Sequence, residues 1–183
     1  MVATTLLLAR HGETDWNRER RWQGHADPPL NETGRQQART LAADAAGVEA
    51  VYASDLARAR ETAEIVAAAL GVPLQLDPRL READVMDLTG RSVTEVIGDW
   101  PRPLDFVLAE RPELFEAMRG RVVAALEEIA AAHDGGRVLV VTHGGPIAAA
   151  WFACGGTNEA RPTVGNCHVH PIRVEGSRMA GID

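Results

Sequence analysis

The chain has 183 residues, of which 45% are hydrophobic and 25% are charged, and its formal net charge at pH 7 is −7. This composition is typical of a single globular domain over residues 1–183, and no run approaches the roughly 20 apolar residues that cross a bilayer, so we expect no membrane partner. Because an acidic molecule repels the phosphate backbone that supplies most nucleic-acid affinity, the charge also argues against a nucleic-acid partner.

The N-terminal apolar run over residues 4–9 predicts a buried strand that ends directly before Arg10 and His11. This run lacks the basic leading region and the small-residue cleavage site of a signal peptide, so we expect a cytoplasmic protein. The two cysteines, Cys154 and Cys167, have neither a Cys-x-x-Cys nor a Cys/His ligand spacing. That spacing disfavours both a disulfide scaffold and a structural zinc site.

Strand patterns alternate with helical patterns along most of the chain. In chain order we predict a strand over 4–9, a helix over 34–46, a strand over 50–53, a helix that stops at Gly71, a strand over 74–76, a short helix over 92–98, a helix over 112–132, a strand over 138–141, a helix from Pro146 to Cys154, and terminal strands over 169–174 and 179–182. This alternation predicts an α/β protein with a three-layer α/β/α architecture, in which helices cover both faces of a mostly parallel central sheet.

The starts of two helices are predicted from residues that commonly cap helices. Thr33 and Gln36 have the spacing of a capping box, so the first helix should begin at residue 34. Ser54 and Asp55 can each accept a hydrogen bond from the first turn of a helix, and we expect them to cap the second one.

Two histidines directly follow predicted strands. His11 comes after the first strand and His143 comes after the strand over 138–141, and a glycine follows each of them. In parallel sheets ligands bind beyond the carboxyl ends of the strands, so both imidazoles should lie at the same edge. Glycine lets backbone N–H groups approach an anion closely, and the fork of donors on Arg10 suits phosphate oxygens. The pattern therefore predicts a phosphate pocket at this edge.

A series of short motifs follows these histidines in a fixed order. The motifs are Arg10-His11-Gly12-Glu13-Thr14, Asn17, Gln23-Gly24, Asp27-Pro28-Pro29-Leu30, Thr33-Gly34, Ser54-Asp55-Leu56-Ala57-Arg58-Ala59 with Thr62-Ala63, Leu80-Arg81-Glu82, and Thr142-His143-Gly144-Gly145. In order and spacing this set resembles the histidine phosphatase superfamily, the group that includes the cofactor-dependent phosphoglycerate mutases. The resemblance covers nearly the whole chain, and it implies a phosphoglycerate mutase-like fold and the phosphatase branch of the family.

The resemblance also implies a role for each motif residue. His11 would be the nucleophile that accepts the phosphoryl group, and Glu82 would donate a proton to the leaving oxygen. His143 would be the third catalytic residue, because phosphoryl transfer depends mainly on positioning and on stabilising the charge of the oxygens. Neither a metal nor another cofactor is implied. The implied phosphate-binding groups are Arg10, Asn17, Arg58 and the Gly144 backbone, and the candidates for the substrate pocket are Gln23 and Gly24.

Two segments depart from the family's pattern. After Glu82 the family commonly continues with a glycine, a tryptophan and a Glu-Gly pair, whereas the residues before Gly90 differ here. Residues 111–114 also replace a Gly-Gly-Glu-Ser turn that touches substrate in many members. Two prolines interrupt this region, so we treat residues 83–111 as a short diverged insertion over one edge of the sheet, with only a short helix.

Three functions fit these residues. The first is a phosphomonoesterase that acts on a small phosphorylated metabolite, the second is a mutase that returns the phosphoryl group to another hydroxyl, and the third is a catalytically weak protein that binds phosphorylated ligands. Glu82 and His143 lie only about 60 residues apart, whereas mutases carry a longer insertion there to enclose a bisphosphorylated intermediate. Thr14 and Gln23 also look phosphatase-like, so the phosphatase hypothesis is favoured. The sequence names no substrate, and it leaves a homodimer open.

Overall fold

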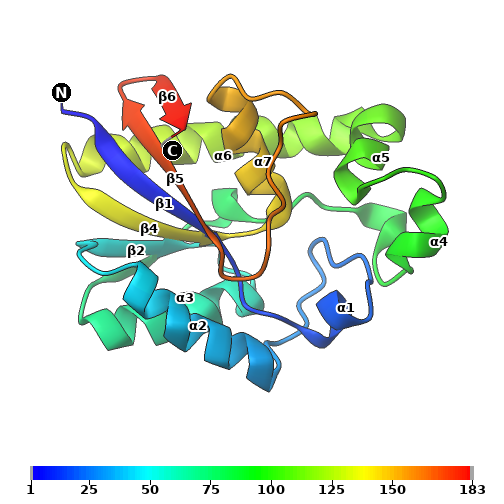
Figure 1. Ribbon diagram of the computed structural model, residues 1–183, viewed down its shortest axis with the longest axis horizontal. Coiled ribbons are helices and arrows are strands. Elements are labelled where there is room, and N and C mark those ends of the chain that lie inside the picture. Colours follow the sequence, from blue (N-terminus) through cyan, green and yellow to red (C-terminus); the bar gives the residue numbers. More distant parts are fainter. Residues whose placement is uncertain (1, 182–183) are drawn as a thin grey trace.

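The fold was analysed in a computed structural model that describes residues 2–181, and these residues build one six-stranded sheet between two layers of helices (Figure 1). The strand order is β3-β2-β4-β1-β5-β6. The first four strands in this order are parallel to one another. Strand β5 runs antiparallel to its neighbour β1, and β6 runs antiparallel to β5. The predicted three-layer α/β/α architecture is confirmed, with a sheet that is mixed. The strands are β1 (Thr4–Arg10), β2 (Ala50–Ala53), β3 (Leu74–Leu76), β4 (Arg137–Thr142), β5 (Val169–Glu175) and β6 (Arg178–Gly181).

All five predicted helices are present, and α1 (Asp15–Arg18) and α5 (Pro103–Glu110) are additional short ones. The other helices are α2 (Glu32–Asp44), α3 (Ala57–Leu70), α4 (Val93–Ile97), α6 (Pro112–Ala132) and α7 (Gly144–Ala153), with 3₁₀ turns η1 (Pro78–Leu80) and η2 (Met86–Leu88). The bounds predicted for the helix over 112–132 are confirmed. The last predicted strand ended at residue 182, which lies outside the described residues.

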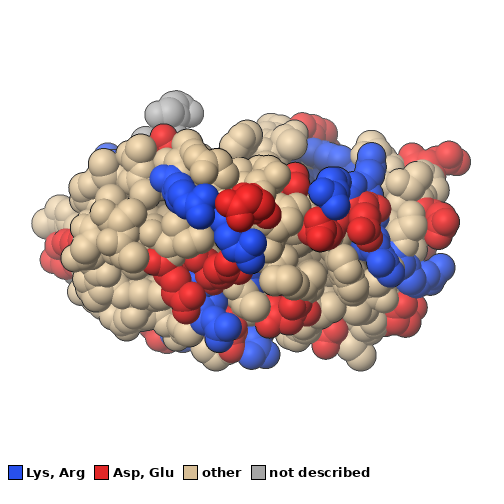
Figure 2. Space-filling view, turned by 90° about the horizontal axis from the view of Figure 1, so that it is seen from below, with Lys and Arg blue, Asp and Glu red and all other residues tan. Residues whose placement is uncertain are grey.

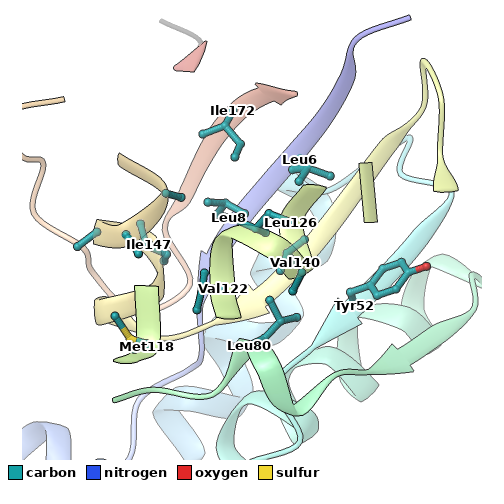
Figure 3. Packing of buried hydrophobic residues seen from close by; sticks show 14 of the residues in the cluster. Leu6, Leu8, Tyr52, Leu80, Met118, Val122, Leu126, Val140, Ile147 and Ile172 are labelled. Carbon is teal, nitrogen blue, oxygen red and sulfur yellow. The ribbon is translucent and has the colours of Figure 1, made fainter. Parts of the chain in front are cut away.

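Side chains of the central strands alternate between two buried cores, one on each face of the sheet. On β1, Leu6 and Leu8 belong to the core that contains side chains of α6 and α7 (Figure 3). Leu7 and Ala9, which point to the other face, belong to the core that contains side chains of α2 and α3. Because both faces are covered, the strand reads as a continuous apolar run instead of an alternating one. This two-sided burial holds the carboxyl ends of β1 and β4 rigidly in place.

The capping box predicted for α2 is wrong. Thr33 and Gln36 lie inside the helix, because α2 begins at Glu32 and its N-cap is Asn31. The Asn31 side chain accepts a hydrogen bond from the Gly34 N–H at 2.9 Å. Asparagine is as good an N-cap as threonine. Because Asn31 comes before Thr33 in the chain, the helix begins after Asn31.

The caps predicted for α3 are also wrong. Neither Ser54 nor Asp55 caps this helix, which begins at Ala57 after an N-cap, Leu56, whose side chain makes no capping bond. A residue from a distant loop replaces them, since the Ala57 N–H donates to Asp27 Oδ1 at 2.7 Å. A capping partner 30 positions earlier in the chain leaves no local pattern for a sequence analysis to detect.

Residues 83–111, predicted to contain one short helix, form η2, α4 and α5. The short helix is confirmed as α4, which Ser92 caps by accepting from the Glu95 N–H at 3.4 Å. The prediction that this segment holds no second helix is wrong. The helix α5 also forms there, and Pro103 occupies its first turn. A proline there loses no hydrogen bond, since the first N–H groups of a helix have no partner within the helix. In Figure 1 both helices lie beyond the carboxyl ends of the strands, not over an edge of the sheet.

Basic and acidic side chains lie close together on the face seen from below Figure 1 (Figure 2). Two such pairs involve α2: Arg35 Nε lies 2.7 Å from Glu61 Oε1 of α3, and Arg39 lies 3.3 Å from Glu32. Solvent-accessible ion pairs contribute roughly 0–1 kcal/mol each to stability, so we do not expect these pairs to determine the fold. Among residues 2–181 no helix combines the length and the apolar character that a membrane span requires.

Candidate active site

The register of two parallel strands brings the two predicted histidines together. β1 pairs with β4 so that Arg10 lies opposite Thr142, and the next residue of each strand is a histidine. The His11 N–H donates to the Thr142 carbonyl at 2.9 Å. As a result, the rings of His11 and His143 have centroids 5.2 Å apart, and both side chains are buried.

His11 is held in the form that a nucleophile requires. Its Nδ1 lies 2.7 Å from the Gly12 carbonyl oxygen, which can only accept, so Nδ1 carries the proton. Its Nε2 accepts a hydrogen bond from Arg58 Nε at 3.3 Å. Burial lowers the pKa of His11 well below 6.5, and the charges of Arg58 and Arg10 lower it further. The imidazole is therefore neutral at pH 7, with a lone pair on Nε2.

Arg58 is a fully buried arginine that is fixed by backbone carbonyls. Its Nη1 donates to the Ala26 oxygen at 2.7 Å, and its Nη2 donates to the Gly24 oxygen at 2.8 Å. Burial lowers the pKa of Arg58 to about 10, so the guanidinium remains charged at pH 7. Gly24 adopts a φ of +48°, which suits glycine, and this turn aims its carbonyl at the guanidinium. Gly24 thus supports Arg58 as well as lining the cavity.

Arg10 adds a second buried positive charge near His11. Its Nη1 donates to the Val164 carbonyl at 3.0 Å. Its Nε is buried and has no hydrogen-bond partner within residues 2–181. Burial lowers the pKa of Arg10, and the charge of Glu82 opposes this effect. A buried donor without an acceptor is costly, so an anionic oxygen in the cavity would stabilise this side chain.

His143 packs against His11 and is not among the residues that line the cavity. Its Nε2 lies 2.9 Å from the Ser54 hydroxyl, and its buried Nδ1 has no partner in the described part of the chain. The Ser54 oxygen already accepts from the Leu56 N–H at 3.3 Å, so its own proton is available for His143 Nε2. Nδ1 would then carry a proton that it can donate to an anion. Burial lowers the pKa of His143 well below 6.5, with Arg58 as the next cause.

Glu82 follows η1 and lines the same cavity. One carboxylate oxygen, Oε2, accepts from the Gly145 N–H at 3.1 Å, in the first turn of α7. The other oxygen, Oε1, accepts from the Ala83 N–H at 2.9 Å. The positive end of a helix favours a negative group, so α7 contributes to holding this carboxylate at the cavity.

The remaining predicted residues also line this cavity. Asn17 caps α1 together with Thr14: its Oδ1 accepts from the Thr14 N–H at 3.1 Å, which leaves its amide N–H groups for a ligand. Gln23 is largely buried, and its Oε1 has no partner within residues 2–181. Gly144 begins α7, where backbone N–H groups lack partners within the helix.

The cavity has a volume of about 420 Å³. One end carries the polar groups just described, and the remainder is largely apolar. The predicted residues that line it are Arg10, His11, Asn17, Gln23, Gly24, Arg58, Glu82 and Gly144. No cluster of three or more His, Cys, Asp or Glu side chains with a metal-binding arrangement occurs in the part of the chain that the structure describes.

Sequence reasoning missed two side chains of the site, and it gave Ser54 a different role. Asn166 donates to the His11 carbonyl at 2.8 Å and contacts Asn17 Oδ1 at 3.4 Å. Arg121 of α6 donates to the Glu82 carbonyl at 2.6 Å. Ser54 stood inside a recognised motif, so its contact with His143 could have been proposed. Asn166 stood in no motif, and nothing in the local pattern pointed to it.

Together these contacts place two neutral histidines, two arginines and a carboxylate close together at the carboxyl ends of parallel strands, with His143 packed behind His11. Such an arrangement suits an enzyme that handles phosphoryl groups, because phosphoryl transfer depends mainly on positioning and on fixed positive charge near the phosphoryl oxygens. The family model described as the histidine phosphatase superfamily (branch 1) matches residues 6–180, and the chain belongs to this superfamily. The membership implied by the motifs is confirmed.

Similar proteins carry both mutase and phosphatase names. Probable phosphoglycerate mutase GpmB of Enterobacter sp. (strain 638) is 38% identical over 185 residues, which cover 94% of this chain and 86% of that protein. The structure of Bacillus stearothermophilus YhfR has a TM-score of 0.82 and 34% identity, covering 97% of this chain and 95% of that one. Mycobacterial glucosyl-3-phosphoglycerate phosphatase has a TM-score of 0.76 and 26% identity, covering 94% and 92%. These names include both hydrolysis and phosphoryl transfer, so they do not distinguish the two reactions for this chain.

Proposed function

We propose that this chain is a phosphomonoesterase that hydrolyses a small phosphorylated metabolite through a phosphohistidine on His11. The observation that carries the proposal is the pair of contacts on the His11 ring: Nδ1 lies 2.7 Å from the Gly12 carbonyl oxygen, and Nε2 lies 3.3 Å from Arg58 Nε. A neutral imidazole oriented in this way is ready to attack phosphorus. Several guanidinium groups next to it can bind the phosphoryl oxygens.

The reaction has two steps. In the first, the Nε2 lone pair of His11 forms a bond to phosphorus while the bond from phosphorus to the alcohol oxygen breaks, and Glu82 gives a proton to that oxygen. In the second step the Glu82 carboxylate takes a proton from water, whose oxygen attacks phosphorus and displaces Nε2. Inorganic phosphate leaves, and His11 and Glu82 return to their starting forms.

Charge stabilisation is assigned to the fixed positive groups. Arg10 and Arg58 would bind the phosphoryl oxygens, and His143 would donate its Nδ1 proton to a third one. The Asn17 amide and the Gly144 N–H would add hydrogen bonds. Because the fold already orients these groups, they need little reorganisation when charge develops on the oxygens.

The walls of the cavity favour a substrate whose alcohol part has apolar surface. Trp22, Val107 and Phe115 are among the residues that line it. Two arginines of the same wall are already engaged by one buried carboxylate: Asp105 lies 2.9 Å from Arg102 and 3.0 Å from Arg161. Arginines that are already paired are less available to a second anionic group of the substrate than unpaired ones. This supports hydrolysis of a substrate whose phosphate is its only anionic group over phosphoglycerate transfer.

Mutase activity is the second candidate, and one observation favours it. Arg20 also lines the cavity, and within residues 2–181 its guanidinium forms no ion pair, so it could bind the carboxylate of a sugar acid. The test is to measure phosphate release across sugar phosphates, phosphoglycerates, nucleotides and phosphoamino acids. In parallel, 3-phosphoglycerate is incubated with its bisphosphate cofactor, and the 2-isomer is measured against free phosphate. We expect phosphate release to dominate, and faster formation of the 2-isomer would replace the proposal with the mutase.

A further inference from the structure

The loop that carries Glu82 is held by side chains at four successive backbone carbonyls. The Thr142 hydroxyl donates to the Leu80 oxygen at 2.7 Å. The carbonyls of Arg79, Arg81 and Glu82 all accept from one side chain, that of Arg121. This run includes the end of the 3₁₀ turn η1 and the residues that follow it, and it takes its position from other elements.

Arg121 makes this contact from the middle of α6. Its Nη1 donates to the Arg79 and Arg81 oxygens, each at 2.6 Å, and its Nη2 donates to the Glu82 oxygen at 2.6 Å. No carboxylate within residues 2–181 forms an ion pair with this guanidinium, so its donors serve the backbone. Half-burial lowers the pKa of Arg121, and the charge of Glu82 opposes this. A charged donor to three carbonyls holds a loop more strongly than neutral hydrogen bonds do.

Other contacts fix the ends of this run. His25 Nε2 lies 2.9 Å from the same Glu82 oxygen that Arg121 contacts. The Arg81 guanidinium binds both oxygens of Asp55, with Nε 2.7 Å from Oδ1. These contacts anchor the loop to neighbouring loops, whereas Arg121 anchors it to a 21-residue helix that packs on the central sheet. Arg121 therefore links the backbone of Glu82 itself to the core, while Thr142 of β4 holds the neighbouring Leu80 carbonyl.

We propose that Arg121 is a positioning residue for proton transfer, which holds the Glu82 carboxylate at the distance from His11 that protonation of the leaving oxygen requires. This inference rests on the proposed function of Glu82 as proton donor. Removing the guanidinium would free three carbonyls at once, and the carboxylate at the end of the loop would move with them. A displacement of about 1 Å is enough to lower a rate by roughly 10²-fold.

The test compares Arg121→Lys with Arg119→Lys on two substrates. Arg119 lies on the same helix, is exposed, and contacts only Glu116 at 3.5 Å, so it is the matched control. An alkyl phosphate needs a proton for its leaving oxygen, whereas 4-nitrophenyl phosphate does not. We expect Arg121→Lys to lower kcat/KM on the alkyl phosphate by roughly 10- to 100-fold and to leave the burst of nitrophenol nearly unchanged. Arg119→Lys should change neither.

The double variant Glu82→Gln/Arg121→Lys tests this inference separately from the proposed role of Glu82 as proton donor. If Arg121 acts through Glu82, then Arg121→Lys has no further effect on the alkyl phosphate in the Glu82→Gln background. Losses that multiply, or an Arg121→Lys loss that is equal on both substrates, would show a merely structural role and overturn the inference alone. If Glu82→Gln itself lost activity equally on both substrates, the proton-donor assignment would fail, and this inference with it.

Discussion

Arg58 donates from Nε to Nε2 of His11 at 3.3 Å, so a buried positive charge lies against the nitrogen that would attack phosphorus. Burial lowers the pKa of the imidazole most, the charge of Arg58 lowers it further, and the contact with Arg58 also aligns the ring. When substrate binds, Arg58 must shift this hydrogen bond from His11 to a phosphoryl oxygen. The two residues come from the loop after β1 and from the first turn of α3.

His143→Ala should leave a measurable but weaker phosphatase. The variant loses one donor to the phosphoryl oxygens while the nucleophile stays in place, so we expect kcat to fall by roughly 10²- to 10³-fold. Steady-state phosphate release is the measurement, with His168→Ala outside the cavity as the control. Wild-type turnover by His143→Ala would remove His143 from the proposed site.

Stability should fall as the pH is lowered from about 6.5 to about 5. His11 and His143 have folded-state pKa values well below 6.5, so in this range the unfolded chain binds protons that the native protein excludes. Stability is therefore fully present above the unfolded pKa, and each histidine can remove up to about 1.4 kcal/mol per pH unit. Urea unfolding across this range is the measurement. His11→Asn should reduce the slope, and an unchanged slope would contradict the burial of a neutral ring.

Gly145→Ala should impair proton donation by Glu82 without changing that residue. A β-carbon at Gly145 would collide with the Glu82 carboxylate, so the carboxylate must move away from the start of α7. We expect the loss on alkyl phosphates to exceed the loss on aryl phosphates by roughly 10-fold or more. Gly120→Ala, also in a helix but with open space around the added carbon, is the control and should stabilise α6 by about 0.5–1 kcal/mol. Equal losses on both substrates would contradict the account of Glu82.

Chelators should not inhibit the enzyme. The positive charge that other phosphatases take from a metal is assigned here to Arg10 and Arg58. Activity should therefore survive EDTA treatment and should not rise when divalent ions are added. Inactivation by EDTA that a divalent ion reverses would show that the arginines are insufficient.

The core of the site could be predicted from sequence because it depends on topology and on short motifs. Strand ends in a parallel sheet meet at one edge, so His11 and His143 could be placed together without any distance information. The remaining parts depend on long-range contacts with the backbone. Arg121 recognises three carbonyls that any residue type would present, and Asp27 caps α3 from 30 positions away. Such partners leave no pattern in the sequence, which is why they emerged only from the fold.

The most direct test of the account is to trap the phosphorylated enzyme. The protein is mixed with a substrate carrying a radiolabelled phosphoryl group, quenched during turnover, and digested so that the labelled peptide can be identified. The account predicts an acid-labile label on His11 and neither label nor turnover in His11→Ala. A label that is stable in acid and lies on serine, or normal turnover by His11→Ala, would contradict the central claim that His11 carries the phosphoryl group to water.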